Sequence, residues 1–590
     1  MQRMRIALTL GLVLSVPLHA AVAAEDILLK TALDARAGSV ERARAFADLR
    51  AVATEKSISA LAAFLDDPAW SYPARSVLEA LPGPAADRAL LQALDAVSDE
   101  TLRAGVVNSL GHRRCTEAAA PIAKLLGAGS SVMTEAALNA LGEIASSRAL
   151  EALLAYQPTA ALTTSWADAL VRAADSLQRR DRSNAFKAYQ LVVSRGPDAQ
   201  VVAATVGLAH LAEDPVWSVV DALSSKRRPR QLAALALLRA GEFGPALTEA
   251  VGRSFGTLAP PLQVQVLSVL QDRGDRAAVS TARTGIRSSD TTVRAAAAKL
   301  LAVFGEESDA AGLVPMMTGE DDLAAAARLA LSRLPGDHPT RLLLDAFHGT
   351  GAVRAAALEV LVARGYRALV PELVRPELYA DENFSGPAAN ALATLGTGRD
   401  FRAALELYRQ FPPARRPLLD AALRRLATKD SDAATATAAV VAALEKLPAS
   451  ESGSLYVLLA AIGGDAAFDA LSAAAKSAAV EQRKAALRAF GNWRDTQPTT
   501  FLLERARDDV DAAVRSSAVR AATNLYSKSA FGGAGAGPVA ALVPGTIEGL
   551  KKTWPLATNR MDRNAILVAL RGLKDPNAKA LADEWEAVMK

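Results

Sequence analysis

The chain has 590 residues, of which 51% are hydrophobic but only 5% aromatic, and its 67 Lys and Arg residues nearly balance 63 Asp and Glu residues. This near balance argues against a nucleic-acid binder, which would concentrate basic charge on one face. Alanine and leucine dominate, and no sustained alternation of β-branched residues is bounded by hairpin dipeptides, so the predicted fold class is all-α.

The N-terminal segment, residues 1–24, has the pattern of an export signal. Two arginines precede an apolar run from Ile6 to Leu18, and small residues lead to the acidic Glu25. We expect cleavage after Ala23 or Ala24, with an uncleaved membrane anchor as the alternative. Cleavage would leave 65 basic and 63 acidic residues, a net charge of +2. The expected product is exported, periplasmic or secreted, and not an integral membrane protein.

A repeated pattern follows the signal: a helix that ends in Leu-Gly, a short turn and a second apolar helix. Its clearest copies are residues 102–126, 133–154, 293–317, 353–373, 388–407, 484–503 and 514–526. The first two closing glycines, Gly111 and Gly142, are 31 residues apart. A fixed period of this size is typical of a solenoid, and apolar residues spaced by three and four predict two amphipathic helices per unit. We expect each closing glycine to adopt a left-handed cap.

The repeats carry a family resemblance. Three of them begin with a Val-Arg pair, at Val293-Arg294, Val353-Arg354 and Val514-Arg515, before the Leu-Gly phrase and an Ala-Leu-Val-Pro-like helix. This pattern resembles the HEAT repeat in its short bacterial form, which is similar to the repeats of phycobilisome-lyase-type proteins. The resemblance implies an α-solenoid of about seventeen stacked helix pairs that binds partners.

The end of the chain departs from the repeat. Phe531 to Pro544 is rich in glycine, and the last recognisable helices follow it. We therefore predict a HEAT-like solenoid over residues 25–530, a glycine-rich loop over residues 531–545 and a C-terminal helical cap over residues 546–590.

Cys115 is the only cysteine, so an intramolecular disulfide is excluded. His112 and two arginines lie just before it, and positive charge would favour a thiolate. The repeat register places Cys115 in an inter-helix turn, where the next repeat has Ser146. We interpret the position as an exposed structural turn. The alternative is an enzyme of the HEAT-containing lyase type that uses Cys115.

No other pattern indicates catalysis, a metal or a cofactor. The histidines form no i, i+4 pair, and no glycine loop follows a strand. Three acidic runs, at Asp66-Asp67, Glu320-Asp321-Asp322 and Asp508-Asp509, lack the spacing of a calcium loop. We expect these runs to cap helix N-termini.

Five residues are candidate binding residues: Trp70, Tyr72, Trp166, Arg227 and Arg228. Exposed aromatic residues on a concave face would anchor a partner, although packing in the core is the alternative for each tryptophan. The two arginines lie beside a predicted turn, where they could be solvated helix ends or an anion-binding patch. The predicted function is an exported scaffold that binds a protein or peptide through its concave surface. A cell-envelope protein that binds polysaccharide or anionic lipid is a further alternative.

Overall fold

The computed structural model describes the chain except for residues 1–17, 128, 430–431, 532–537, 540 and 590. The described residues form 35 α-helices and 13 short 3-10 helices, with no β-strand among them and one isolated backbone bridge between Phe531 and Pro538. The predicted all-α class is confirmed. The chain divides into two compact units, residues 1–300 and 301–590, with the boundary inside α18 (Thr291–Phe304).

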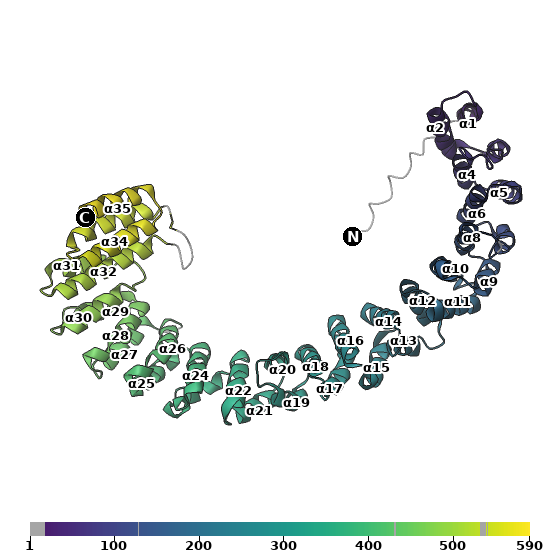
Figure 1. Ribbon diagram of the computed structural model, residues 1–590. Coiled ribbons are helices and arrows are strands. Elements are labelled where there is room, and N and C mark those ends of the chain that lie inside the picture. The colour runs from purple at the N-terminus through teal and green to yellow at the C-terminus, as the bar shows by residue number, and fades with distance from the viewer. Residues whose placement is uncertain (1–17, 128, 430–431, 532–537, 540, 590) are drawn as a thin grey trace, which may run out of the picture. The chain divides into compact units, whose positions relative to one another are not determined.

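Within each of the two units the helices alternate between two layers, which Figure 1 shows as two rows. Layer A comprises α1 (Leu18–Leu33), α3 (Ile58–Ala62), α5 (Pro84–Ala96), α7 (Ala119–Ala123), α9 (Ser147–Ala155), α11 (Arg182–Arg195), α13 (Pro215–Leu223), α15 (Gly244–Ser254), α17 (Val279–Gly285), α19 (Ala310–Leu313), α21 (His338–Phe347), α23 (Val370–Leu373), α25 (Phe401–Gln410), α27 (Ala433–Leu444), α29 (Gly464–Ala474), α31 (Thr499–Asp508) and α33 (Val543–Thr553).

Layer B contains the second helix of each pair. It comprises α2 (Ser39–Val52), α4 (Ser71–Ala80), α6 (Glu100–His112), α8 (Ser131–Ile144), α10 (Thr163–Leu177), α12 (Asp198–Leu211), α14 (Arg228–Ala240), α16 (Pro260–Arg273), α18, α20 (Asp322–Arg333), α22 (Gly351–Ala363), α24 (Glu382–Leu395), α26 (Pro417–Thr428), α28 (Gly453–Ile462), α30 (Val480–Phe490), α32 (Ala512–Ser529) and α34 (Arg560–Gly572). Each layer B helix packs on the next, from α2 to α16 in the first unit and from α20 to α34 in the second. The seventeen pairs agree with the predicted number, and α35 (Pro576–Met589) closes the chain.

The helices are amphipathic in the way that the sequence spacing predicts. In α25 the buried side chains include Phe401, Ala404, Leu405 and Tyr408, at positions i, i+3, i+4 and i+7. These positions share one face of an α-helix, and that face packs against α26 and α27. A single pair cannot bury such a face, so neighbouring pairs within a unit pack their apolar faces against each other.

Two of the closing glycines have a different role from the predicted one. Gly111 and Gly142 lie inside α6 and α8, not in a left-handed cap. A Cβ on Gly111 would lie 2.7 Å from the Cα of Ala140, and one on Gly142 would lie 2.8 Å from the Cα of Ala169. Glycine therefore allows successive layer B helices to approach each other closely. The predicted cap is wrong at these two positions.

Gly305 and Gly396 also lack a positive φ, whereas two other closing glycines confirm the left-handed cap. Gly336 and Gly365 have φ values of +78° and +68°, a region that L side chains rarely adopt. After α6 and α8, the positive φ belongs instead to Arg114 and Ala145. The chain thus reverses with a left-handed residue after α6, α8, α20 and α22, but glycine supplies it in only some repeats.

In two of the three Val-Arg pairs, the arginine closes the preceding turn, whereas Arg354 of the third lies over the Phe384 ring. Arg294 Nη1 donates to the carbonyl oxygen atoms of Ser288 and Ser289, at 2.9 and 3.1 Å. In the later repeat, Arg515 Nη1 donates in the same way to Asp509 and Val510, at 2.7 and 3.2 Å. These carbonyl groups end the first helix of each pair, where no intrahelical donor remains. The pair Val-Arg therefore marks the start of a layer B helix.

A second set of arginines joins consecutive repeats. Arg364, just after α22, donates to the carbonyl oxygen atoms of Leu331 and Leu334 at 2.7 and 2.8 Å, and to that of Gly336 at 3.0 Å. These carbonyl groups lie at the C-terminal end of α20, in the previous pair. Arg113, just after α6, donates to three such carbonyl groups near the end of α4. A cation at a helix C-terminus also interacts favourably with the helix dipole.

The two ends of the chain differ in part from the prediction. Most of the predicted signal, residues 1–17, lies outside the described residues, and α1 extends through the expected cleavage positions Ala23 and Ala24. At the other end, α33 begins at Val543, inside the predicted loop of residues 531–545, of which residues 532–537 and 540 are not described. Among the described helices, none is long and apolar enough to cross a bilayer.

Candidate functional site

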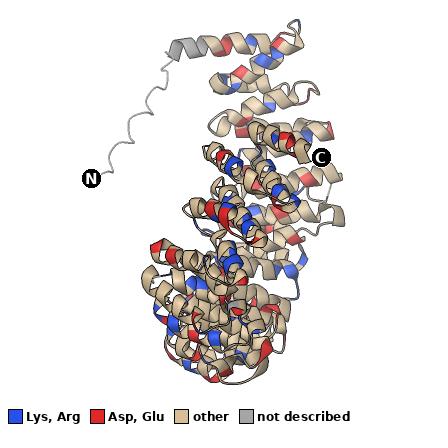
Figure 2. Ribbon diagram, turned by 90° about the vertical axis from the view of Figure 1, so that its left-hand side faces the viewer, with Lys and Arg blue, Asp and Glu red and all other residues tan. Residues whose placement is uncertain are grey.

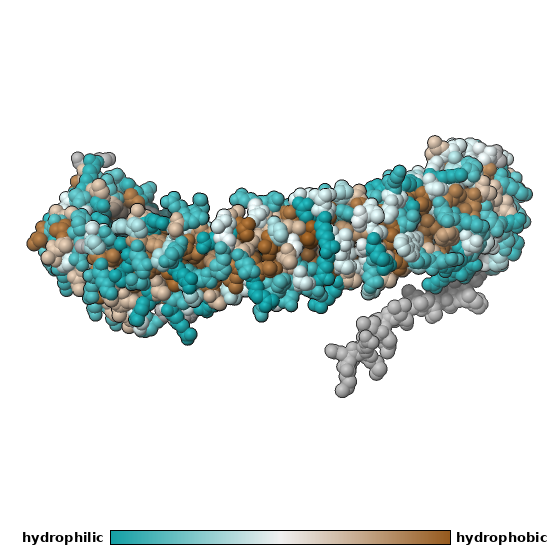
Figure 3. All heavy atoms as spheres, turned by 90° about the horizontal axis from the view of Figure 1, so that it is seen from below, coloured by the Kyte–Doolittle hydropathy of each residue, from teal (hydrophilic) through white to brown (hydrophobic). Residues whose placement is uncertain are grey.

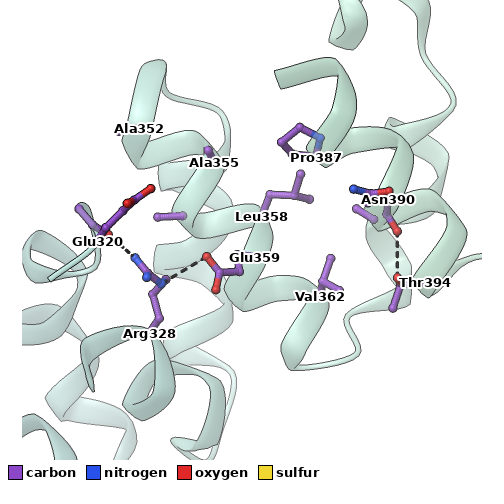
Figure 4. A pocket seen from close by; sticks show the side chains of 13 residues that line it. Glu320, Arg328, Ala352, Ala355, Leu358, Glu359, Val362, Pro387, Asn390 and Thr394 are labelled. Atoms are coloured by element: carbon purple, nitrogen blue, oxygen red, sulfur yellow. Dashed lines mark hydrogen bonds and ion pairs between the residues drawn. The ribbon is translucent and has the colours of Figure 1, made fainter. Parts of the chain in front are cut away.

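A groove along the layer B helices of the second unit has a volume of about 640 Å³. It lies between α22 and α24, and one end of it reaches α20 (Figure 4). Its lining residues are Gly319, Glu320, Arg328, Ala352, Ala355, Ala356, Leu358, Glu359, Val362, Pro387, Asn390, Ala391 and Thr394. The volume falls within the ~300–1,000 Å³ that is usual for ligand sites.

Small side chains create the hollow. Ala356, Leu358 and Ala391 form its buried floor, and the more accessible Ala352, Ala355 and Val362 line its wall on α22. An alanine on a helix leaves space that a leucine at the same position would fill. The interior of the groove is therefore apolar and still partly accessible, which suits the side chain of a binding partner.

The helix on the far side of the groove contains two residues that disfavour helices. Gly386 and Pro387 lie at the fifth and sixth positions of α24, and the ring of Pro387 lines the groove. Proline inside a helix removes a backbone hydrogen bond and costs about 3 kcal/mol or more. Beyond the residues that adjoin it in the chain, a Cβ on Gly386 would have no neighbour within 4 Å and its φ is not positive, so packing against other helices does not require the glycine. Its lack of a Cβ does relieve the clash that Pro387 would make with the preceding residue of a helix. Such local conflicts concentrate at functional sites.

One rim of the groove is charged. Arg328 Nη1 donates to the carbonyl oxygen atoms of Met317 and Gly319, at 2.8 and 2.9 Å, and its Nε lies 3.3 Å from a carboxylate oxygen of Glu359. The arginine is thus held by the loop before α20 as well as by α22. Glu320 lies beside it and is exposed, with no hydrogen bond or ion pair to its side chain among the described residues. Excess negative charge therefore remains at this rim.

The opposite rim is polar and uncharged. Asn390 and Thr394 lie one turn apart on α24, and the Thr394 hydroxyl donates to the Asn390 carbonyl at 2.9 Å. The side-chain amide of Asn390 is exposed and makes no hydrogen bond within the described part of the chain. An amide offers both a donor and an acceptor, which are what the backbone of a bound peptide requires.

Two of the predicted binding residues, Trp70 and Trp166, lie at or in the core of the first unit. Trp166 is fully buried, and its indole Nε1 donates to the Leu153 carbonyl at 3.0 Å. It has no surface to offer a partner in this structure, so its role as an exposed anchor is corrected to one in packing. Trp70 is half-buried, stacks on Phe46 with ring centroids 5.5 Å apart and carries the Arg42 guanidinium on its ring.

Tyr72 and the two arginines are placed differently. The side chain of Tyr72 is 74% exposed at the start of α4. Arg227 donates to the carbonyl groups of Val193 and Gly196, so it belongs to the set that joins repeats. Arg228 is exposed and contacts two glutamines. The structure does not bring these residues and the tryptophans together into one site.

Charged and hydrophobic surface residues do not identify another site. Figure 2 shows Lys and Arg interspersed with Asp and Glu along the helices. In Figure 3, hydrophobic side chains are interspersed with hydrophilic ones on the face that is seen from below. Scattered exposed apolar residues are normal on protein surfaces. The groove differs because its apolar side chains line a hollow and polar side chains form the two edges of that hollow.

Cys115 is buried and not in the exposed turn that the repeat register predicts. Its backbone does lie between two helices, but the side chain turns into the core. Burial raises the pKa of its thiol to about 11, and the nearby carboxylates of Asp87 and Glu117 act in the same direction. A thiol with this pKa holds little thiolate at neutral pH. His112, which lies just before Cys115 in the sequence, is 2.9 Å from Glu143 of the next repeat.

The described residues contain no group of three or more His, Cys, Asp or Glu side chains that could hold a metal ion. The acidic run at Glu320 behaves as predicted in part, since Asp321 caps α20 by accepting from the Ala324 N–H at 2.8 Å. Asp509 instead forms a buried ion pair with Arg483. Asp321 therefore caps a helix, and Asp509 takes part in a buried ion pair.

The sequence prediction missed the groove for an identifiable reason. The repeat pattern in the sequence begins at Ala388. This start would place Pro387 just before a helix, where proline is common. In the structure α24 begins six residues earlier, at Glu382, because Asp381 caps it by accepting from the Asn383 N–H. The sequence feature that could have revealed the groove is the capping residue Asp381, because a helix that starts after it contains Gly386 and Pro387 in its interior.

Comparisons with known proteins identify the repeat. The family model described as HEAT repeats matches residues 88–185. No curated protein matches the chain. Among solved structures, a chain of the Kap95p–RanGDP structure is 11% identical with a TM-score of 0.33, and the match covers 95% of this chain and 89% of that one.

Two further structures show a similar degree of likeness. Importin beta is 11% identical with a TM-score of 0.30, over 95% of this chain and 90% of that one. Kap121p is 11% identical with a TM-score of 0.31, over 96% and 80%. Scores this low add nothing to the fold that the helix pairs already establish.

Proposed function

Because the chain is a HEAT-repeat protein built from stacked helix pairs, we propose that it is a non-enzymatic scaffold that binds a segment of another protein in the groove between α22 and α24. The observation that carries the proposal is the groove itself, with its apolar floor and its two polar rims. Apolar burial would supply most of the affinity, and the rims would orient the bound segment.

Other observations on the groove support the same function. Gly386 and Pro387 lower the stability of α24 without serving its packing, which is expected where function opposes folding. The enzyme alternative has less support, because the Cys115 thiol is buried and its pKa is raised. The alternative of an anion-binding patch also has less support, because Arg227 is engaged with carbonyl groups.

The proposal is tested by photocrosslinking in the producing cell. We place benzoylphenylalanine at Thr394, an exposed residue on the rim of the groove, and at Ala363, an exposed residue of α22 that does not line the groove. We expect a discrete protein adduct at position 394, identified by mass spectrometry, and none at position 363. Equal adducts at both positions, or none at 394, would contradict binding in the groove.

We also propose that the chain is exported, on the basis of the signal pattern in residues 1–24. N-terminal sequencing of the mature protein from an osmotic-shock fraction should begin at Ala24 or Glu25. Recovery of the full chain, beginning at Met1, in the cytoplasmic fraction would contradict export.

A further inference from the structure

We infer that the groove selects a peptide segment that places an apolar side chain in the groove and a lysine or arginine at the rim formed by Glu320 and Glu359. This inference rests on the proposed function, because it concerns the same groove. It adds the chemistry of the partner, which the proposed function leaves open.

The apolar side chain follows from the accessible apolar residues of the groove. Ala355 and Val362 are half-buried and Pro387 is exposed, and none of their side chains has a polar group, so an apolar group can cover them without losing hydrogen bonds to water. The volume of about 640 Å³ is sufficient for more than one side chain. An aliphatic or aromatic residue of the partner is therefore the expected anchor.

The cation follows from the balance of charge at the rim. Arg328 is the only basic residue that lines the groove, and it is already held by two carbonyl groups and by Glu359. Glu320 remains, and the side chain of Glu359 is still 66% exposed. The nearest other cation on α22, Arg354, lies over the Phe384 ring at 4.3 Å. A basic residue of the partner would complete the charge balance.

A peptide suits the groove better than an acyl chain does. The carboxylate of a fatty acid would be repelled by Glu320 and Glu359 at the charged rim, and it can only accept hydrogen bonds at the opposite rim. The free amide of Asn390 on the opposite rim can donate to and accept from a peptide backbone. An acyl chain has no groups for that amide.

The test uses a library of phage-displayed random peptides, selected on the full chain. We expect the enriched peptides to contain an aliphatic or aromatic residue within about two positions of a lysine or arginine. Binding should fall more than about tenfold in Ala355→Trp, which fills the groove, and should persist in the matched control Ala363→Trp. Circular dichroism and thermal unfolding of both variants establish that they are folded.

A second comparison isolates the charge. The double variant Glu320→Gln, Glu359→Gln should bind the enriched peptides about threefold to tenfold more weakly at low salt, and the difference should shrink at high salt. Glu377→Gln, an exposed residue that does not line the groove, is the control and should bind as the parent does.

The outcomes separate the two proposals. Enriched peptides that require the open groove but lack basic residues would overturn this inference and leave the proposed function standing. The absence of any peptide that distinguishes Ala355→Trp from Ala363→Trp would overturn both. Dansylated undecanoic acid is the acyl probe, and its saturable binding, lost only in Ala355→Trp, would overturn the inference in favour of an acyl-chain site.

Discussion

At the scale of single residues, the same amino acid has different roles in similar repeats. Gly111 is required because the backbone of α8 lies against it, whereas Gly386 has open space where a Cβ would be. Sequence alone presents both as glycines in or beside helices. The distance from the missing Cβ to its neighbours distinguishes them.

This difference predicts opposite effects for one substitution. Gly111→Ala should destabilise the protein by about 1–3 kcal/mol, because its Cβ would meet a backbone atom that cannot easily move. Gly545→Ala, in the first turn of α33, where a Cβ would also have no neighbour within 4 Å and no proline follows, should stabilise it by about 0.5–1 kcal/mol, because alanine is the better helix former. Urea unfolding followed by circular dichroism measures both. Effects of the same sign would contradict the structure.

The side chain of Glu25 attaches α1 to the residues that follow α2. Its side chain is fully buried, and its carboxylate accepts from the Thr54 N–H at 2.6 Å and from the Ser57 hydroxyl at 2.7 Å. Burial by itself would raise the pKa of this carboxyl. The hydrogen bonds from Ser57 and Thr54 outweigh burial and hold the pKa below its usual value of 4.5.

A pH dependence follows for the first helix pair. A carboxyl whose pKa is lower in the folded chain stabilises it above the unfolded pKa, and that stabilisation is lost as the pH falls through the folded value. Glu25→Gln should therefore weaken the hydrogen-exchange protection of α1 and α2 at neutral pH. The difference from the parent should vanish well below pH 4.5. A difference that stays constant with pH would contradict an ionised Glu25.

At the scale of helices, the contacts between consecutive pairs depend on capping as well as on apolar packing. Arg364 supplies three hydrogen bonds to the end of α20 and a fourth, at 3.2 Å, to the Thr340 hydroxyl. Without it, several partly buried carbonyl groups would lose their donors. A buried acceptor without a donor costs about 1–3 kcal/mol.

Arg364→Met keeps the apolar stem and removes the donors. We expect a loss of about 2–4 kcal/mol in the free energy of unfolding, measured with urea. The matched control is Arg333→Met, an exposed residue in the last turn of α20, which should change stability by less than about 1 kcal/mol. Equal losses in the two variants would show that the capping bonds contribute nothing.

At the scale of the whole molecule, stability should be local. In an array of helix pairs each pair contacts only its neighbours, so folding free energy is a sum of pair and interface contributions. A single free energy of unfolding for the complete chain is then an average over regions that open separately.

Local stability predicts which helices lose hydrogen-exchange protection when one helix pair is destabilised. In Gly111→Ala, hydrogen-exchange protection should fall in α6 and α8 and to a lesser extent in the adjoining α4 and α10. Protection in α30 and α32 should not change. Mass-spectrometric hydrogen exchange resolves these segments, and a uniform loss over the whole chain would show that it unfolds as one cooperative body.

The sequence by itself determined the repeated architecture. The period of about 31 residues, the apolar spacing of three and four and the Val-Arg pairs are local patterns, and helix pairing is a local consequence of them. The all-α class and the seventeen pairs could therefore be predicted without a structure. The Val-Arg pair was recognised as a pattern, although its bonds to the preceding turn were visible only in coordinates.

Only the tertiary structure decided what each position does. The burial of Cys115 and Trp166, the close approach at Gly111 and the groove beside Pro387 all depend on residues about 30 positions away or on the exact start of a helix. Periodicity specifies which face of a helix is apolar, but not how closely two such faces approach. That distance is set by the packing of neighbouring pairs, and it determines where the surface is hollow.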